Sequence, residues 1–303
     1  MSGQPHRTGG LILRKSCDPM HIHSAWRQYF THRHEGLGTT YERFLLHRIF
    51  GHIVVQHAVK SVLEVPSFGM TGVSGINSLW WAEQNIPVTL LDNDRERVEY
   101  IRKVWQELSF EADIRYHPIE TPTALPFDDQ SFDMTWNFAA LWFVPVLEQF
   151  LAELTRMSRR VILLCIPNRL NIFHLIRMRS PEMVNSVYVD NIHAGKISDI
   201  MNKLHWKLEK QDYFDIPPWP DIAMNKEKIL QKIGFKRLGQ SLEQGKDREP
   251  LCILDYFNGK NTRMEQAALK YAFLENSPRL FAKFWAHHQY LIFVPALPRQ
   301  QRL

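Results

Sequence analysis

Residues 61–77 read SVLEVPSFGMTGVSGIN, and this stretch decides the fold. Its apolar start, residues 62–65, is typical of a buried β-strand. Gly69, Gly72 and Gly75 follow, and glycines allow the backbone to turn sharply and to approach a ligand closely. The stretch therefore predicts a strand that runs into a glycine-rich turn and then into a helix.

A second apolar run, residues 88–91, ends in Asp92. An acidic residue at the end of the second strand can accept hydrogen bonds from both hydroxyls of a ribose. The glycine spacing does not follow the G-x-G-x-x-G dinucleotide pattern, which argues against a nicotinamide dehydrogenase. The turn and the acid together predict a nucleoside-containing cofactor with Asp92 as ribose acceptor. The alternative role for Asp92 is to cap the helix that begins near Asp94.

The segment LPFDDQSFDMTWN, residues 125–137, resembles the LPF…SFD stretch of the class I, Rossmann-like methyltransferases that use S-adenosylmethionine. The order around it is similar as well: a glycine turn, an acidic strand end, LPF…SFD, and an apolar strand at residues 161–168. The resemblance covers about residues 40–170, with a closing strand near 288–294. It implies an α/β fold with a seven-stranded, mostly parallel sheet, helices on both faces, and a C-terminal helical cap insertion.

The resemblance also implies where S-adenosylmethionine binds. The family motif D/E-x-G-x-G-x-G is divergent here, because Pro66 stands in place of its first glycine and removes an amide donor. The acidic strand end corresponds to the ribose position, the residues after the third strand to the adenine, and those after the fourth strand to the sulfonium. The implied cofactor-binding residues are Glu64, Pro66, Phe68, Gly69, Thr71, Gly72, Asp92, Asn93, Glu120, Thr121, Asn137 and Phe138.

Alternating strands and helices predict right-handed crossovers and a parallel sheet covered on both faces. The apolar patterns place a leading helix over residues 40–59 and further helices near 74–84, 94–108, 144–157, 221–234 and 262–286. They place strands near 61–65, 87–92, 112–116, 132–136, 160–166, 206–214 and 289–294.

The chain divides into four predicted parts. Residues 1–39 form an N-terminal extension and residues 40–214 the Rossmann-like cofactor-binding core. Residues 215–286 are interpreted as a helical cap that carries the substrate site, because connections this long inside a compact domain usually have a function. Residues 287–303 provide the closing strand and a tail.

Methyl transfer is an in-line displacement, so the protein mostly aligns the reactants, and a base is needed only when the acceptor is protonated. The catalytic residue stays open, with His193, Asp221, His287 and His288 as the candidates. Aromatic faces can stabilise a sulfonium or ammonium group, so Trp142 and Trp219 are the candidates for the substrate side.

The sequence predicts no metal site. His21 and His23, and likewise His32 and His34, form H-x-H pairs near the N-terminus, but no cysteine or carboxylate completes a ligand set nearby. The three cysteines show no C-x-x-C spacing and suggest no disulfide framework. No apolar run is long enough to span a bilayer and no signal peptide is recognised, so we expect a cytoplasmic protein.

These patterns favour a methyltransferase that acts on a small or medium-sized, partly apolar molecule. One alternative is a catalytically inactive relative that serves as a binding or scaffold protein. Another is a nucleic-acid or protein methyltransferase, for which the net charge of +5 is the sole support and which is therefore disfavoured. The basic, apolar residues 169–179 leave peripheral membrane contact as an option, and the oligomeric state stays open.

Overall fold

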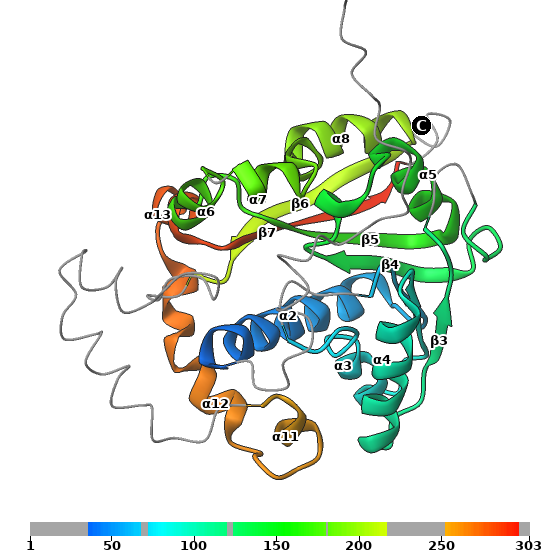
Figure 1. Ribbon diagram of the computed structural model, residues 1–303, viewed down its shortest axis with the longest axis vertical. Helices are drawn as coiled ribbons and strands as arrows, with labels where there is room; N and C mark the ends of the chain where they lie inside the picture. The colour runs from blue at the N-terminus through cyan, green and yellow to red at the C-terminus, as the bar shows by residue number, and fades with distance from the viewer. Residues whose placement is uncertain (1–35, 68–71, 120–123, 180, 217–251, 297–303) are drawn as a thin grey trace, which may run out of the picture.

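The computed structural model describes residues 36–67, 72–119, 124–179, 181–216 and 252–296 (Figure 1). Its centre is a seven-stranded sheet in the order β3-β2-β1-β4-β5-β7-β6. β7 runs antiparallel to both of its neighbours, and every other pairing in the sheet is parallel. The strands are β1 (Val62–Glu64), β2 (Val88–Asp92), β3 (Asp113–Tyr116), β4 (Phe132–Phe138), β5 (Ser158–Pro167), β6 (Trp206–Phe214) and β7 (His288–Pro295).

The central strands are buried along most of their length because helices cover both faces of the sheet. All seven residues of β4 are buried, and so are the last seven of β5. The predicted seven-stranded, mostly parallel sheet is confirmed, with its strand positions, as is the α/β fold class.

Two layers of helices enclose the sheet (Figure 1). One layer consists of α2 (Gly36–His57), α3 (Leu79–Glu83) and α4 (Arg95–Glu107), and the other of α5 (Leu147–Met157), α6 (Ile172–Arg177), α7 (Pro181–Asn185) and α8 (Ala194–Lys203). Short helical pieces complete the described chain: η1 (Leu141–Phe143), η2 (Val189–Ile192), α11 (Leu254–Phe257), α12 (Met264–Ala268), η3 (Leu269–Asn276) and α13 (Arg279–Trp285).

Several predicted helices differ in length from those in the structure. The helix expected over residues 74–84 is α-helical only as α3, since the chain before it turns through Gly75 at φ +67°. The segment expected to be helical over 262–286 consists of three pieces, α12, η3 and α13, and Pro278 stands at the start of α13. The leading helix begins earlier than expected, at Gly36. The helix predicted near 221–234 lies outside the described residues.

The fold brings several of the predicted site residues to one edge of the sheet, where the parallel strands end. Glu64, Asp92 and Phe138 are the last residues of β1, β2 and β4. His288, the first residue of β7, pairs with Pro167 at the end of β5 on one side and with the end of β6 on the other. Ligands of open α/β sheets bind at this carboxyl edge, so the candidate site is sought there.

Candidate functional site

The turn after β1 is fixed by its backbone. The amide of Gly75 donates to the carbonyl of Ser67 at 2.6 Å and so closes the loop between them. Gly72 and Gly75 have φ angles of +75° and +67°, which favour glycine over any residue with a side chain. A Cβ at Gly75 would lie 3.0 Å from the side chain of Ile101, so this glycine also lets α4 approach the sheet. Phe68, Gly69 and Thr71 lie outside the described residues.

Glu64 ends β1 in a fully buried position. The hydroxyl of Ser78 donates to its Oε2 at 2.5 Å, whereas its Oε1 is buried without a hydrogen-bond partner among the described residues. Burial raises the pKa of Glu64 to about 8, because the charged carboxylate loses its hydration in the core. At neutral pH the folded protein therefore keeps a proton on this carboxyl group.

Asp92 is buried and its carboxylate already receives four hydrogen bonds. Oδ2 accepts from Ser67 Oγ at 2.9 Å and from Arg97 Nε at 3.0 Å. Oδ1 accepts from the Asp94 amide at 2.9 Å and from Arg97 Nη2 at 2.6 Å. A carboxylate offers about four lone-pair positions. A ribose can therefore bind Asp92 only if Arg97 withdraws, which the sequence did not reveal. Capping of α4 belongs to Asp94, whose Oδ1 accepts from the Arg97 amide at 3.1 Å.

Asn137 lies near the end of β4, beside β1, and is completely buried. Neither its amide nitrogen nor its amide oxygen has a hydrogen-bond partner among the described residues. Buried polar groups without partners are rare in folded proteins. Phe138 follows, with its ring 4.8 Å from the imidazole of His288.

Other predicted site residues have different surroundings. Trp142, in η1, is 1% exposed and stacks on His174 with ring centroids 6.1 Å apart. His193 is exposed and caps α8, its Nδ1 accepting from the Lys196 amide at 3.3 Å. Asn93 follows Asp92 directly, and Arg97 Nη2 reaches its side-chain oxygen at 3.4 Å. Glu120, Thr121, Trp219 and Asp221 lie outside the described residues.

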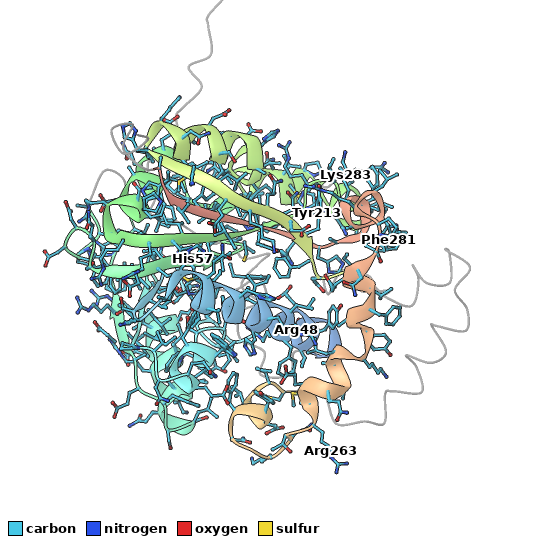
Figure 2. All side chains as sticks on the ribbon, turned by 180° about the vertical axis from the view of Figure 1, so that it is seen from behind. Arg48, His57, Tyr213, Arg263, Phe281 and Lys283 are labelled. Atoms are coloured by element: carbon cyan, nitrogen blue, oxygen red, sulfur yellow. The ribbon has the colours of Figure 1, made fainter. Side chains whose placement is uncertain are left out.

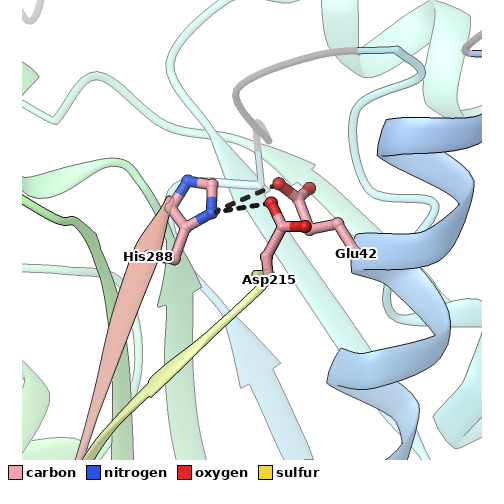
Figure 3. Close-up of side chains that lie close together, drawn as sticks. All are labelled: Glu42, Asp215 and His288. Carbon is pink, nitrogen blue, oxygen red and sulfur yellow. Dashed lines mark ion pairs between the residues drawn. The ribbon is translucent and has the colours of Figure 1, made fainter. Parts of the chain in front are cut away.

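Three buried ionisable side chains meet at the other end of this edge (Figure 3). His288 Nδ1 lies 3.3 Å from Glu42 Oε2 and 3.8 Å from Asp215 Oδ2. We call these residues the Glu42–Asp215–His288 cluster. His287 lies beside it, with Nδ1 at 3.0 Å from Asp215 Oδ2.

The neighbouring histidines set the pKa of Asp215. Burial acts to raise the pKa of Asp215, but His287 and His288 outweigh it and hold this pKa below its usual value. Behind the cluster, the hydroxyl of Tyr41 donates to Glu275 Oε1 at 2.6 Å, and the Ile216 amide donates to the same oxygen at 2.9 Å. Burial raises the pKa of Glu275 to about 7.

Sequence reasoning found His287 and His288 but missed the acids that face them. Glu42 and Asp215 are far apart in the chain and belong to no motif, so no spacing signals that they meet. Arg97 was missed for a different reason. It lies in the first turn of α4 among charged residues, which are usually exposed, yet its side chain is only 10% exposed.

Part of the chain matches a known protein family. Residues 69–163 match the family model described as a methyltransferase domain. No curated protein matches the chain. Similar solved structures include a putative sarcosine dimethylglycine methyltransferase from Galdieria sulphuraria, with 10% identity over 84% of each chain and a TM-score of 0.49. They also include the YcgJ protein of Bacillus subtilis, with 14% identity, 82% of this chain and 98% of that chain covered, and a TM-score of 0.46. These likenesses are too distant to bear on substrate or activity.

The strand order, the glycine turn after β1 and the acidic end of β2 agree with the family match. Residues 69–163 are thus similar to a methyltransferase domain, and this match supports the resemblance of the chain to the class I, Rossmann-like methyltransferases, with a divergent glycine motif.

Proposed function

We propose that this protein binds S-adenosylmethionine at the carboxyl edge of the sheet and transfers its methyl group, by in-line displacement, to a small or medium-sized, partly apolar molecule. The observation that carries the proposal is a pair of unsatisfied polar groups on adjacent strands. Oε1 of Glu64 and the whole side-chain amide of Asn137 are buried without partners among the described residues. Each such group costs about 1–3 kcal/mol, and a bound ligand with polar groups would recover that free energy.

The cofactor supplies the reactive methyl group, and the chain's residues bind and orient it. In this proposal Glu64 and Asn137 contact the amino-acid part and the sulfonium side, together with Phe138. Asp92 would accept hydrogen bonds from the ribose hydroxyls once the Arg97 side chain has moved away from it. Asn93 follows Asp92 directly. The predicted cofactor site also includes the glycine turn and two residues after the third strand. These residues are Pro66, Phe68, Gly69, Thr71, Gly72, Glu120 and Thr121.

An apolar rim at the same edge supports a partly apolar substrate. α13 ends two residues before His287, and its start bears Leu280, which is 71% exposed. α6 begins beside the end of α13, since the Asn171 side chain donates to the carbonyl of Trp285 at 2.9 Å. Figure 2 shows Phe281 and Lys283 on this rim. The exposed apolar side chains of the rim are Ile172, Leu175, Ile176, Val184, Leu280, Phe281 and Phe284.

The rim also supports contact with the surface of a membrane. Arg179 and Arg279 are exposed at its margins, and apolar side chains flanked by cations are typical of interfacial binding. None of the described helices is long and apolar enough to cross a membrane. Trp142 and Trp219 remain the proposed aromatic contacts of the substrate. His287 and His288 are the catalytic candidates nearest the strand ends, and a cytoplasmic location remains part of the proposal.

One observation favours the inactive binding protein as a second candidate. The Arg97 guanidinium occupies both oxygens of Asp92, and a bidentate, mostly buried pair of this kind is strong. If Arg97 stays in place, the ribose has no acceptor at the end of β2. Pro66 in the glycine turn points in the same direction, because it removes an amide donor.

Calorimetric titration of the purified chain with S-adenosylhomocysteine separates the two candidates. The sample is first checked for copurified nucleoside by mass spectrometry. Micromolar binding supports the methyltransferase and makes a screen of apolar acceptors worthwhile. The absence of binding to a folded, ligand-free chain would refute cofactor use and favour the scaffold. Steeply salt-dependent binding to RNA would instead favour the nucleic-acid enzyme.

A further inference from the structure

The Glu42–Asp215–His288 cluster takes no part in the proposed cofactor contacts. Its side chains come from α2, from the residue after β6 and from the first residue of β7. Each offers one ligand atom, and the three atoms lie within 4.8 Å of one another (Figure 3). We propose that this cluster binds one divalent transition-metal ion, of the Zn²⁺, Fe²⁺ or Mn²⁺ type.

The geometry fits a shared ion. Two ligand atoms that lie ~2.1 Å from one ion at a tetrahedral angle are ~3.4 Å apart. His288 Nδ1 is 3.3 Å from Glu42 Oε2 and 3.8 Å from Asp215 Oδ2. The three side chains therefore already converge at about the spacing that a shared ion requires.

The charge of the cluster also calls for a cation. Glu42, Asp215 and His288 are all buried, with exposed fractions of 8%, 2% and 6%. Buried carboxylates are stable only when they are paired or bind a metal ion. Two ionised carboxylates carry a charge of −2, which one divalent ion balances.

An unsatisfied oxygen points to a ligand independently of these distances. Asp215 Oδ1 is buried and has no hydrogen-bond partner among the described residues. The other oxygen of the same carboxylate is held by His287 Nδ1 at 3.0 Å. Carboxylates that bind metals are typically oriented by such an outer hydrogen bond, so His287 is a positioning residue for Asp215.

The ligand set selects the class of ion. Imidazole favours zinc and iron over magnesium and calcium, and carboxylate oxygens extend the range to manganese. Three protein ligands leave a coordination position open, as in catalytic zinc sites and unlike the closed four-ligand structural ones. The site lies at the edge where the substrate is proposed to bind, so the open position is suited to an oxygen or nitrogen of a small molecule.

The test is a calorimetric titration of the full chain with ZnCl₂ after treatment with a chelator. The N-terminal histidine pairs could bind zinc themselves, so the titration is done in a background with His21, His23, His32 and His34 replaced by Gln. We expect one ion per chain with a dissociation constant of micromolar or below. Asp215→Asn and His288→Gln should each weaken binding by at least ~10-fold, since even the loss of an outer-shell partner costs about 10- to 100-fold.

Asp133→Asn is the matched control. Asp133 is also buried, at 4% exposure, and pairs with Arg159 and Arg160. It lies at the start of β4, the opposite end of the strand from the site, so its replacement should leave the zinc affinity unchanged. Circular dichroism and thermal melting establish that each variant is folded.

The visible absorption spectrum of the chain loaded with Co²⁺ gives a second readout that needs no destabilising variant. Bands of a carboxylate–imidazole site that disappear when one equivalent of Zn²⁺ is added would support the proposal. A chain that binds no stoichiometric ion would overturn it. So would folded Glu42→Gln, Asp215→Asn and His288→Gln variants that retain the zinc affinity of the background. Neither titration involves S-adenosylmethionine, so failure here is distinct from failure of the proposed function.

Discussion

Asp92 offers the sharpest test of the cofactor site, through the substitution Asp92→Asn. The proposed site requires this carboxylate to accept the ribose hydroxyls, yet Arg97 Nε and Nη2 lie 3.0 and 2.6 Å from its two oxygens. Asparagine keeps the shape of the side chain but removes its charge and one acceptor oxygen. The substitution therefore probes the charge at this position with little change in volume.

The magnitude follows from the bonds that are lost. A hydrogen bond to a charged group contributes about 1.5–3 kcal/mol, and 1.36 kcal/mol corresponds to a tenfold change in affinity. The dissociation constant for S-adenosylhomocysteine should rise about 10- to 100-fold in Asp92→Asn, measured by calorimetric titration. Thermal melting is recorded first, because Arg97 loses its partner and the variant must be folded at the assay temperature.

Two further variants make the result interpretable. Asp133→Asn removes the charge of another buried, arginine-paired carboxylate, and it should bind the ligand as the unmodified chain does. Arg97→Lys keeps the positive charge but cannot form the two-pronged contact, so it should bind at least as tightly, because less of the pair has to open. Unchanged affinity in Asp92→Asn would refute the ribose argument and would mean that Asp92 serves Arg97 alone.

Asn137→Leu should raise the free energy of unfolding of the ligand-free chain by about 1–3 kcal/mol in urea denaturation, because it removes an unpaired buried amide; a loss of stability would show that the amide has a partner. The pKa of Glu64 is raised to about 8 in the folded protein, so its carboxyl group ionises in the unfolded state first. The free energy of unfolding should therefore fall as the pH rises from about 4.5 to 8, by at most ~1.4 kcal/mol per pH unit. Denaturation midpoints of Glu64→Gln across this range should lack that decline, and an equal decline in both proteins would contradict the assignment. Replacing Leu280 and Phe284 together by Ser should reduce cosedimentation with phosphatidylserine vesicles at least ~10-fold, since each buried apolar side chain contributes about 1.5–3 kcal/mol. Val55→Ser is the control, because Val55 is 86% exposed and lies on α2, outside the rim; equal losses in both would argue against a specific membrane surface.

Much of the fold could be predicted because its signals are local. β5 carries a continuous apolar run over residues 161–166, which is typical of a strand buried on both faces, and β4 has an apolar residue at every second position. Gly75 marks a turn that no other residue fits, given its positive φ and its contact with Ile101. Helix boundaries were less accurate, as in α3, where turn residues share the apolar pattern of the helix that follows.

The candidate site was only partly predictable. Glu64, Asp92 and Asn137 could be named because each stands at or next to the end of a strand, where the family resemblance implies cofactor contacts. What surrounds them could not be named. The contact between Arg97 and Asp92 depends on the rotamer of the Arg97 side chain in the first turn of α4. The lack of a hydrogen-bond partner for the Asn137 amide among the described residues depends on every side chain that packs around it.

The sequence by itself determined the alternation of strands and helices and the class of sheet, because these depend on which side chains leave water along each segment. Only the tertiary structure brought Glu42, Asp215 and His288 together. Their meeting depends on where α2 crosses the sheet and on the pairing of β7 between β5 and β6. Contacts between distant segments are set by packing and register, and no local pattern in the chain records them.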